Sequence, residues 1–252
     1  MGVRTKNKLL AIKILLILIC ILYTVILYFD FFSTEFFSSL SLAKLISIML
    51  CFSLSVLTGK DYLNKGDKYL LQSGLFITMI ADFMILFTDY LALGVGIFSI
   101  VHILYIMRYE RNKSRLLLVR MVFLLLIILG IYLVTNFLIM EINLLFAAAL
   151  FYAVALIISV IKAIKSYRHK LFPYPNRSFI ALGMVLFLLC DINVGIFNII
   201  ILTSNSNGIA SLLYNISGLL MWFFYLPSQV LLSLSGYDFS SFSKKYRTGE
   251  LL

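Results

Sequence analysis

Four ionisable side chains lie inside long apolar segments of the sequence, where charged residues are rare: Lys44, Asp82, His102 and Asp191. An ionisable group in the hydrocarbon region of a bilayer is costly unless it is paired or hydrated, so such residues usually mark functional sites. Two carboxyls, an imidazole and an amine are the groups used in acid–base catalysis, proton relay or cation binding. The first candidate for chemistry in this chain is therefore an intramembrane site.

The depths of these four residues overlap. With a helix rise of about 1.5 Å per residue, Lys44 and Asp82 lie roughly 6–8 Å from the outer boundary of their segments. His102 and Asp191 lie near the middle of theirs. We therefore expect the four side chains to converge in one pocket in the outer half of a helix bundle.

Structural explanations are also open for each residue. Lys44 is close enough to the outer boundary to snorkel into the interface, or it could form an ion pair with Asp82. His102 could satisfy a hydrogen bond between helices. Asp191 is the hardest to explain in this way, because a carboxyl in mid-bilayer must be neutral or held by polar neighbours such as Asn193.

The elements that must position these residues are transmembrane helices. The 252 residues are 62% hydrophobic and 13% charged, whereas soluble domains are about half apolar and a quarter charged. Apolar runs of the roughly 20 residues needed to cross a bilayer recur along the chain, without the alternation of barrel strands. The sequence predicts an all-α polytopic transmembrane bundle, a single domain over residues 1–252. The eight expected spans are roughly 9–29, 40–57, 69–87, 91–109, 116–138, 143–161, 178–202 and 209–235.

The distribution of basic residues predicts the orientation. Every Lys and Arg except Lys44 lies in the N-terminal segment, in alternate connections or in the C-terminal tail. Cytoplasmic connections are the ones enriched in Lys and Arg, so both termini are expected to be cytoplasmic, with residues 236–252 as a short basic tail. We expect an integral protein of the plasma membrane of a bacterium. Arg108, Arg111 and Arg115, placed in a basic connection, could also bind anionic head groups of membrane lipids.

Several other classes of protein do not fit this sequence. The net charge of +10 is spread over short connections, so no basic domain for nucleic acid is expected. The three cysteines, Cys20, Cys51 and Cys190, lie in apolar runs without disulfide or metal-binding spacing. His102 is the only histidine in a span, so a three-histidine zinc site cannot be built. No metal and no cofactor are expected, and the sequence does not indicate an oligomeric state.

Four stretches in a fixed order carry a resemblance to a known family. Lys44 lies in SLAKLISIML, and Asp82 in IADFMILF. The second stretch continues with GVGIFSIVHILY, which contains His102 and Tyr105. The third is LGMVLFLLCDINVGIFN with Asp191, and the fourth is WFFYLPSQVLL with Tyr225 and Gln229. Together they resemble the YhhN-like lysoplasmalogenases, a family of eight-span membrane proteins.

The resemblance implies hydrolysis of the vinyl ether bond of alkenyl lysophospholipids to a fatty aldehyde and a glycerophospho-base. Such a reaction needs one protonated and one ionised carboxyl. The working hypothesis gives the acid role to Asp191, as the deeper residue, and the charged role to Asp82, near Lys44. His102, Tyr105, Tyr225 and Gln229 would orient the catalytic groups or bind substrate, and Lys44 could bind the substrate phosphate.

The alternative function is a non-enzymatic transporter or lipid-handling protein. In that case the two aspartates and His102 would relay protons or bind a cation. Helices broken by glycine or proline in mid-span would favour this alternative, and Pro227 is the only proline inside an expected span. Aldehyde release from an alkenyl lysophospholipid would separate the two functions.

Overall fold

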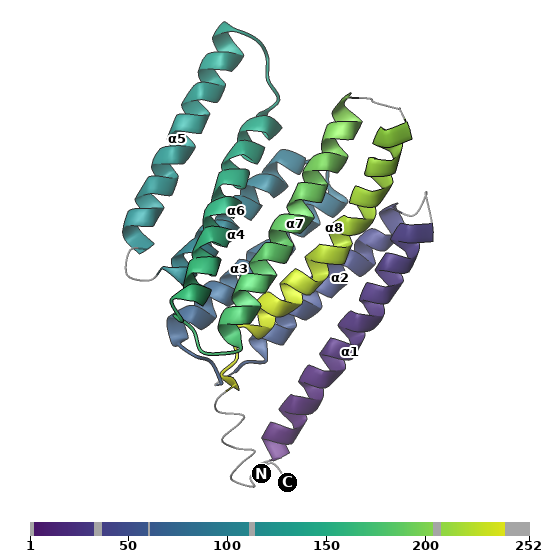
Figure 1. Ribbon diagram of the computed structural model, residues 1–252, viewed down its shortest axis with the longest axis vertical. Coiled ribbons are helices and arrows are strands. Elements are labelled where there is room, and N and C mark those ends of the chain that lie inside the picture. Colours follow the sequence, from purple (N-terminus) through teal and green to yellow (C-terminus); the bar gives the residue numbers. More distant parts are fainter. Residues whose placement is uncertain (1–2, 33–36, 60, 111–113, 204–207, 240–252) are drawn as a thin grey trace.

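Long helices run along the length of the molecule (Figure 1). The computed structural model describes residues 3–32, 37–59, 61–110, 114–203 and 208–239. The helices within these residues are α1 (Val3–Phe32), α2 (Phe37–Val56), α3 (Lys65–Phe87), α4 (Leu91–Tyr109), α5 (Ser114–Leu138), α6 (Leu144–Arg168), α7 (Asn176–Thr203) and α8 (Gly208–Leu234).

The expected fold class is confirmed. Seven of the described helices are long and apolar enough to cross a membrane, and α2 contributes a shorter apolar helix, Leu40–Val56. The described part of the chain contains no β-strand beyond an isolated bridge between Tyr62 and Tyr237. Two expected spans are too short, because α1 continues past residue 29 to Phe32 and α6 continues past residue 161 to Arg168. Charged side chains at a membrane boundary can continue a helix, so hydropathy alone places helix ends poorly.

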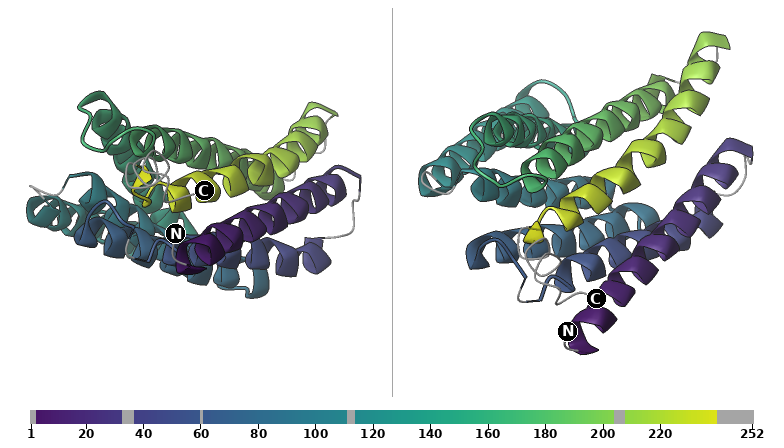
Figure 2. Two further views of the ribbon diagram at one scale, coloured as in Figure 1. Left: turned by 90° about the horizontal axis from the view of Figure 1, so that it is seen from below. Right: turned by 60° about the horizontal axis from the view of Figure 1, so that its bottom comes forward.

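The helices that carry the expected site residues form the centre of the bundle. The closest neighbours are α7 and α8, α3 and α4, and α4 and α6. Figure 2 shows α7 and α8 running side by side on one side of the bundle and α2 and α3 on the other. Helix α5 packs on α4 and α6, whereas α1 packs on α2 and α8. Thus α1 and α5 flank a core made by the other helices.

One end of the bundle gathers several segments that are distant in sequence. Lys8 of α1 donates to Asp61 at 2.7 Å and to the carbonyl of Thr58 at 2.6 Å. Tyr237, which follows α8, donates its hydroxyl to the Leu54 carbonyl at 2.5 Å, and burial raises the pKa of this tyrosine. We call the end formed by residues 57–59, 61–64, 108–110, 162–173 and 235–239 the basic end.

Proline inside α8 creates a contact with α1. Pro227 has no backbone N–H, so the carbonyl of Phe223, four residues earlier, lacks its usual helical donor. The hydroxyl of Tyr23 donates to this carbonyl at 3.0 Å. The Tyr23 contact therefore joins α1 to α8 at Phe223, two residues before Tyr225.

Candidate active site

Asp82 lies on the inner face of α3 and is held by a tyrosine of α8. Its side chain is buried, with 6% exposure, and its Oδ2 accepts a hydrogen bond from the Tyr225 hydroxyl at 2.7 Å. Tyr225 is itself buried against the rings of Phe187 and Trp222. The predicted proximity of Asp82 and Tyr225 is therefore present in the fold.

Asp191 of α7 has a similar arrangement. Its Oδ2 accepts a hydrogen bond from the Tyr152 hydroxyl of α6 at 2.6 Å, and the aspartate is only partly buried. The sequence analysis missed Tyr152, because nothing in its local sequence distinguishes it from the other tyrosines of the chain. The signal that could have found it is its seven-residue spacing from Ser159, which places both residues on one helix face.

The two aspartates belong to one cluster. They come from α3 and α7, and contacts between the rings of Tyr225, Phe187, His102 and Tyr152 link the donor of one carboxyl to the donor of the other. Within the described residues, neither aspartate forms an ion pair with Lys, Arg or His. Asp82 is the more buried of the two, the reverse of the order of desolvation that the sequence analysis assumed.

Lys44 pairs with a different aspartate from the one expected. Its Nζ lies 3.0 Å from Oδ1 of Asp30, with side-chain exposures of 2% and 11%. The same ammonium lies 5.2 Å from the ring centroid of Trp222. The sequence analysis placed Asp30 in a connection, but α1 extends through it and carries it to Lys44. The expected ion pair between Lys44 and Asp82 is therefore wrong, because the aspartate that pairs with Lys44 is Asp30.

His102 lies beside the donor of Asp191. Its Nδ1 is 3.0 Å from Oγ of Ser159, and its ring centroid is 5.3 Å from that of Tyr152. The imidazole is fully buried. His102 thus contacts the residue that donates to Asp191, which suits a positioning role.

Tyr105 and Gln229 occupy the next helical turns toward the basic end. Tyr105 follows His102 on α4, and its ring is so close to α3 that a Cβ on Gly74 would lie 2.6 Å from it. Gln229 follows Tyr225 on α8 and is fully buried, with no hydrogen bond to either amide atom among the described residues. Both lie next to the aspartate cluster, and neither donates to an aspartate.

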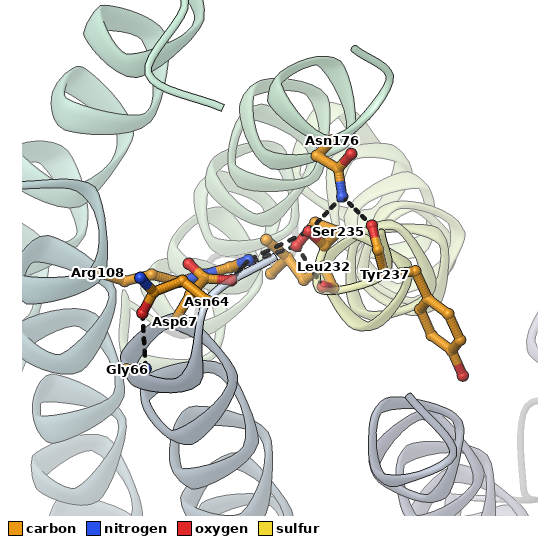
Figure 3. Close-up of polar contacts among 8 residues, drawn as sticks. All are labelled: Asn64, Gly66, Asp67, Arg108, Asn176, Leu232, Ser235 and Tyr237. Carbon is orange, nitrogen blue, oxygen red and sulfur yellow. Dashed lines mark hydrogen bonds and ion pairs between the residues drawn. The ribbon is translucent and has the colours of Figure 1, made fainter. Parts of the chain in front are cut away.

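A second buried ionic cluster lies at the basic end (Figure 3). Arg108 of α4 binds Asp67 of α3 through two bonds, Nε to Oδ1 at 2.9 Å and Nη2 to Oδ2 at 3.1 Å. It also donates to Oγ of Ser235 at 2.9 Å, and Asn176 donates to the Ser235 carbonyl at 2.8 Å. Both charged side chains are almost fully buried.

This cluster corrects one expectation. Arg108 was placed in a basic connection as a candidate ligand of lipid head groups, but it lies within α4 with 0% exposure. Its guanidinium already donates to Asp67 and Ser235. Arg108 therefore joins α3, α4 and the end of α8, and it is not available to a head group. Arg111 lies outside the described residues.

A cavity of about 700 Å³ opens beside this cluster at the basic end. Its lining includes Tyr109, Lys165, Ser166 and His169. An ion pair between Lys162 and Glu110 lies at its edge. The cavity thus combines charged and apolar side chains, and it lies at the end of the bundle from which α3 starts. Asp82 lies about 26 Å along α3 from that start.

A metal centre has no support in the described part of the chain. No group of three or more His, Cys, Asp or Glu side chains there could hold a metal ion. The three cysteines are free thiols, two of them buried. The chemistry available to the site is that of carboxyl, phenol and imidazole groups.

Comparison with known proteins gives one match. The profile of the YhhN family matches residues 40–236, which includes all seven expected site residues. The curated proteins and the solved structures gave no match. Because the matched region covers most of the sequence, this membrane helical protein belongs to the YhhN family.

Proposed function

We propose that the protein is a membrane-embedded hydrolase that cleaves the vinyl ether bond of alkenyl lysophospholipids. The observation that carries this proposal is the pair of intramembrane carboxyls, Asp82 and Asp191, each held by one tyrosine and linked through contacts between aromatic rings. Family membership and the order of the matched motifs agree with it. No metal or cofactor is required for this reaction.

The reaction consists of the addition of water and four proton transfers. An acid protonates the alkene carbon that is not bonded to oxygen, which leaves an oxocarbenium ion. Water adds to this cation while a carboxylate accepts its proton, which gives a hemiacetal. The hemiacetal then gives its hydroxyl proton to the carboxylate that first acted as the acid, its C–O bond to the glycerol oxygen breaks, and the other carboxyl protonates that oxygen. An aldehyde and an alcohol leave, and both carboxyls return to their starting states. The alcohol is the glycerophospho-base, so the elements of one water are consumed.

The difference in burial between the two aspartates supports an assignment of the two roles. Low dielectric surroundings favour the neutral form of a carboxyl, and Asp82 is the more buried aspartate. We therefore assign the proton donor to Asp82 and the carboxylate that receives the proton from water to Asp191. This reverses the sequence-based hypothesis, whose reason for an ionised Asp82 was a neighbouring Lys44, and Lys44 instead pairs with Asp30.

The surrounding side chains would position these groups. Tyr225 and Tyr152 each occupy one oxygen of an aspartate, which leaves Oδ1 of each carboxyl for the reaction. His102 packs on Tyr152 and would fix its orientation. Trp222 and Phe187 contact Tyr225 and provide an apolar wall suited to the alkenyl chain of the substrate.

The test of the proposal is the choice of substrate. Purified protein is incubated with an alkenyl lysophospholipid and with its acyl and alkyl analogues, and aldehyde is measured. We expect aldehyde from the alkenyl compound alone, because only a vinyl ether gives the oxocarbenium ion on protonation. Absence of aldehyde from a folded protein would contradict the proposal and favour a transport role for the aspartates.

We also propose that the basic end faces the cytoplasm, with both termini there, in the plasma membrane of a bacterium. The concentration of Lys and Arg at this end supports the orientation. A cysteine at Glu141, exposed in the α5–α6 connection, should react with an impermeant thiol reagent from outside the cell. A cysteine at Lys65 should not, and external labelling there would overturn the orientation.

A further inference from the structure

Two facing stripes of polar side chains connect the candidate active site with the basic end. On α6, Tyr152, Ser159 and Ser166 follow one another at intervals of seven residues, so they lie on one face of the helix. Both serines are fully buried. From Tyr152 to Ser166 the stripe covers about 21 Å along the helix axis.

The matching stripe on α4 consists of His102, Tyr105 and Tyr109, which are spaced by three and four residues. All three are buried. The ring centroids of His102 and Tyr105 are 6.4 Å apart, and those of Tyr105 and Tyr109 are 6.2 Å apart. The aromatic side chains thus form a continuous row along α4.

The stripes touch each other and end at recognisable places. His102 and Ser159 join them through the 3.0 Å contact between Nδ1 and Oγ. At the end near the aspartates, Tyr152 donates to Asp191. At the opposite end, Tyr109 and Ser166 both line the 700 Å³ cavity of the basic end.

Several polar atoms along the stripes have no well-formed hydrogen bond, although the hydroxyls of Tyr105 and Tyr109 lie near the side chains of Thr78 and Arg108. Among the described residues, none accepts from or donates to the His102 Nε2, the hydroxyls of Tyr105 and Tyr109, or Oγ of Ser166 with normal hydrogen-bond geometry. Buried polar atoms without a protein partner are usually bonded to ordered water, and a water site needs two to four polar neighbours. Four such atoms in succession provide a row of such neighbours.

We propose that water reaches the aspartates from the cavity at the basic end, along the facing polar stripes of α4 and α6. The use of this path, to supply the water consumed in hydrolysis, rests on the proposed function. The existence of the path does not, because it concerns hydration alone. The two claims can therefore be tested separately.

Cysteine accessibility on α6 tests the path. Ser166→Cys and Ser159→Cys place a thiol of nearly the same size on the polar stripe. Phe151→Cys and Val160→Cys are controls on the same helix, since both side chains are buried among apolar residues and each lies about 100° around the helix from the neighbouring stripe residue. Sealed vesicles are treated from either side with a small methanethiosulfonate that carries an ammonium group, and the modified peptides are identified by mass. Lys65→Cys marks the basic end.

We expect the two stripe cysteines to react roughly tenfold faster than the two controls, because the reactive thiolate forms only in contact with water. Their reaction should occur from the side on which Lys65→Cys reacts. Equal rates at stripe and control positions would overturn the path, as would faster reaction from the opposite side. Ser166→Cys removes no side-chain hydrogen bond, so its comparison with Val160→Cys decides whether the path exists even if Ser159→Cys fails to fold.

A second arm tests the use of the path. Aldehyde release by Ser166→Cys is measured before and after the thiol is modified. We expect most of the activity to be lost on modification, because the added group fills the path, while modified wild-type protein loses less. Unchanged activity after complete modification would overturn the role in supply. If no variant or wild-type protein releases aldehyde, the proposed function fails, and the labelling result still decides whether the path exists.

Discussion

The two buried carboxyl clusters of this bundle differ in how completely their polar groups are satisfied. At the basic end, Asp67 accepts two bonds from Arg108, whose remaining donors reach Ser235 (Figure 3). In the other cluster Asp82 and Asp191 each accept from a single tyrosine, and within the described residues neither has a cationic partner. A closed cluster suits a structural role, whereas an open one retains groups for chemistry.

This difference has a physical basis. A buried charge pair with its hydrogen bonds complete gains nothing from a ligand, and removal of one member strands the other. Two carboxyls without a cation avoid a double negative charge most easily if they share one proton. The comparison therefore predicts that variants of the first cluster lose stability, and that variants of the second lose activity.

The largest expected effect is on stability at the closed cluster. Arg108→Met should lower the free energy of unfolding by about 3–5 kcal/mol, because Asp67 is left charged and buried. Thermal unfolding in detergent measures this loss. The double variant Arg108→Met with Asp67→Leu should be more stable than Arg108→Met alone, and a single variant as stable as wild type would show that the cluster is not a structural tie.

The next effect concerns pH at the open cluster. The wild-type rate should follow a bell-shaped profile, because the acid must hold its proton and the base must be ionised. The rate falls at high pH as the acid loses its proton, and at low pH as the base gains one. Asp82→Asn should remove the high-pH limb and Asp191→Asn the low-pH limb, at rates lowered by roughly 10²-fold.

This profile also assigns the roles. If the limbs are exchanged between the two variants, Asp191 is the acid, and the assignment from burial is wrong. The residual rates must be measured on folded protein, with melting temperatures near that of wild type.

A smaller effect is expected at the ion pair between Lys44 and Asp30. Replacing Lys44 by Met leaves a partly buried carboxylate without this partner and should cost about 1–3 kcal/mol of stability. Asp30→Asn should cost a similar amount. If Lys44→Met melts like wild type but loses activity, the lysine serves the substrate and not the fold.

The smallest effect is expected from the tyrosines of the open cluster. Tyr225→Phe and Tyr152→Phe each remove one hydrogen bond to an aspartate, worth about 1 kcal/mol or roughly fivefold in rate. Tyr23→Phe is a matched control, since its hydroxyl donates to the Phe223 carbonyl, away from the aspartates. Rates for Tyr225→Phe and Tyr152→Phe equal to the control would remove these hydroxyls from the mechanism.

Much of this architecture could be predicted from sequence. Continuous apolar runs are sufficient to identify the helices, and isolated aspartates within them identified Asp82 and Asp191. The matched motif also placed Tyr225 in the site. The helix prediction is confirmed because it rests on a local feature, the length of an apolar run. The functional roles of Asp82, Asp191 and Tyr225 stay predictions.

The ionic partners could not be predicted in the same way. Asp30, Asp67 and Arg108 lie near the ends of apolar runs, where hydropathy treats a charge as the boundary of a span. Their burial depends on partners that are distant in sequence, as for Asp67 and Arg108, which are 41 positions apart. Tyr152 was missed because a tyrosine in an apolar helix is common, and only its contact with Asp191 distinguishes it.

The most direct test of the central claim is the rate of aldehyde release by Asp82→Asn, Asp191→Asn and the double variant, each folded and at wild-type abundance. Both changes keep the shape of the side chain and remove its titrating proton. We predict a loss of roughly 10²-fold or more for each single variant, and a double variant about as inactive as the worse single one, because an acid and a base that act together give non-additive losses. Single variants that both retain more than about a third of the activity, well short of the ~10²-fold expected for acid–base catalysis, would contradict the two-aspartate mechanism.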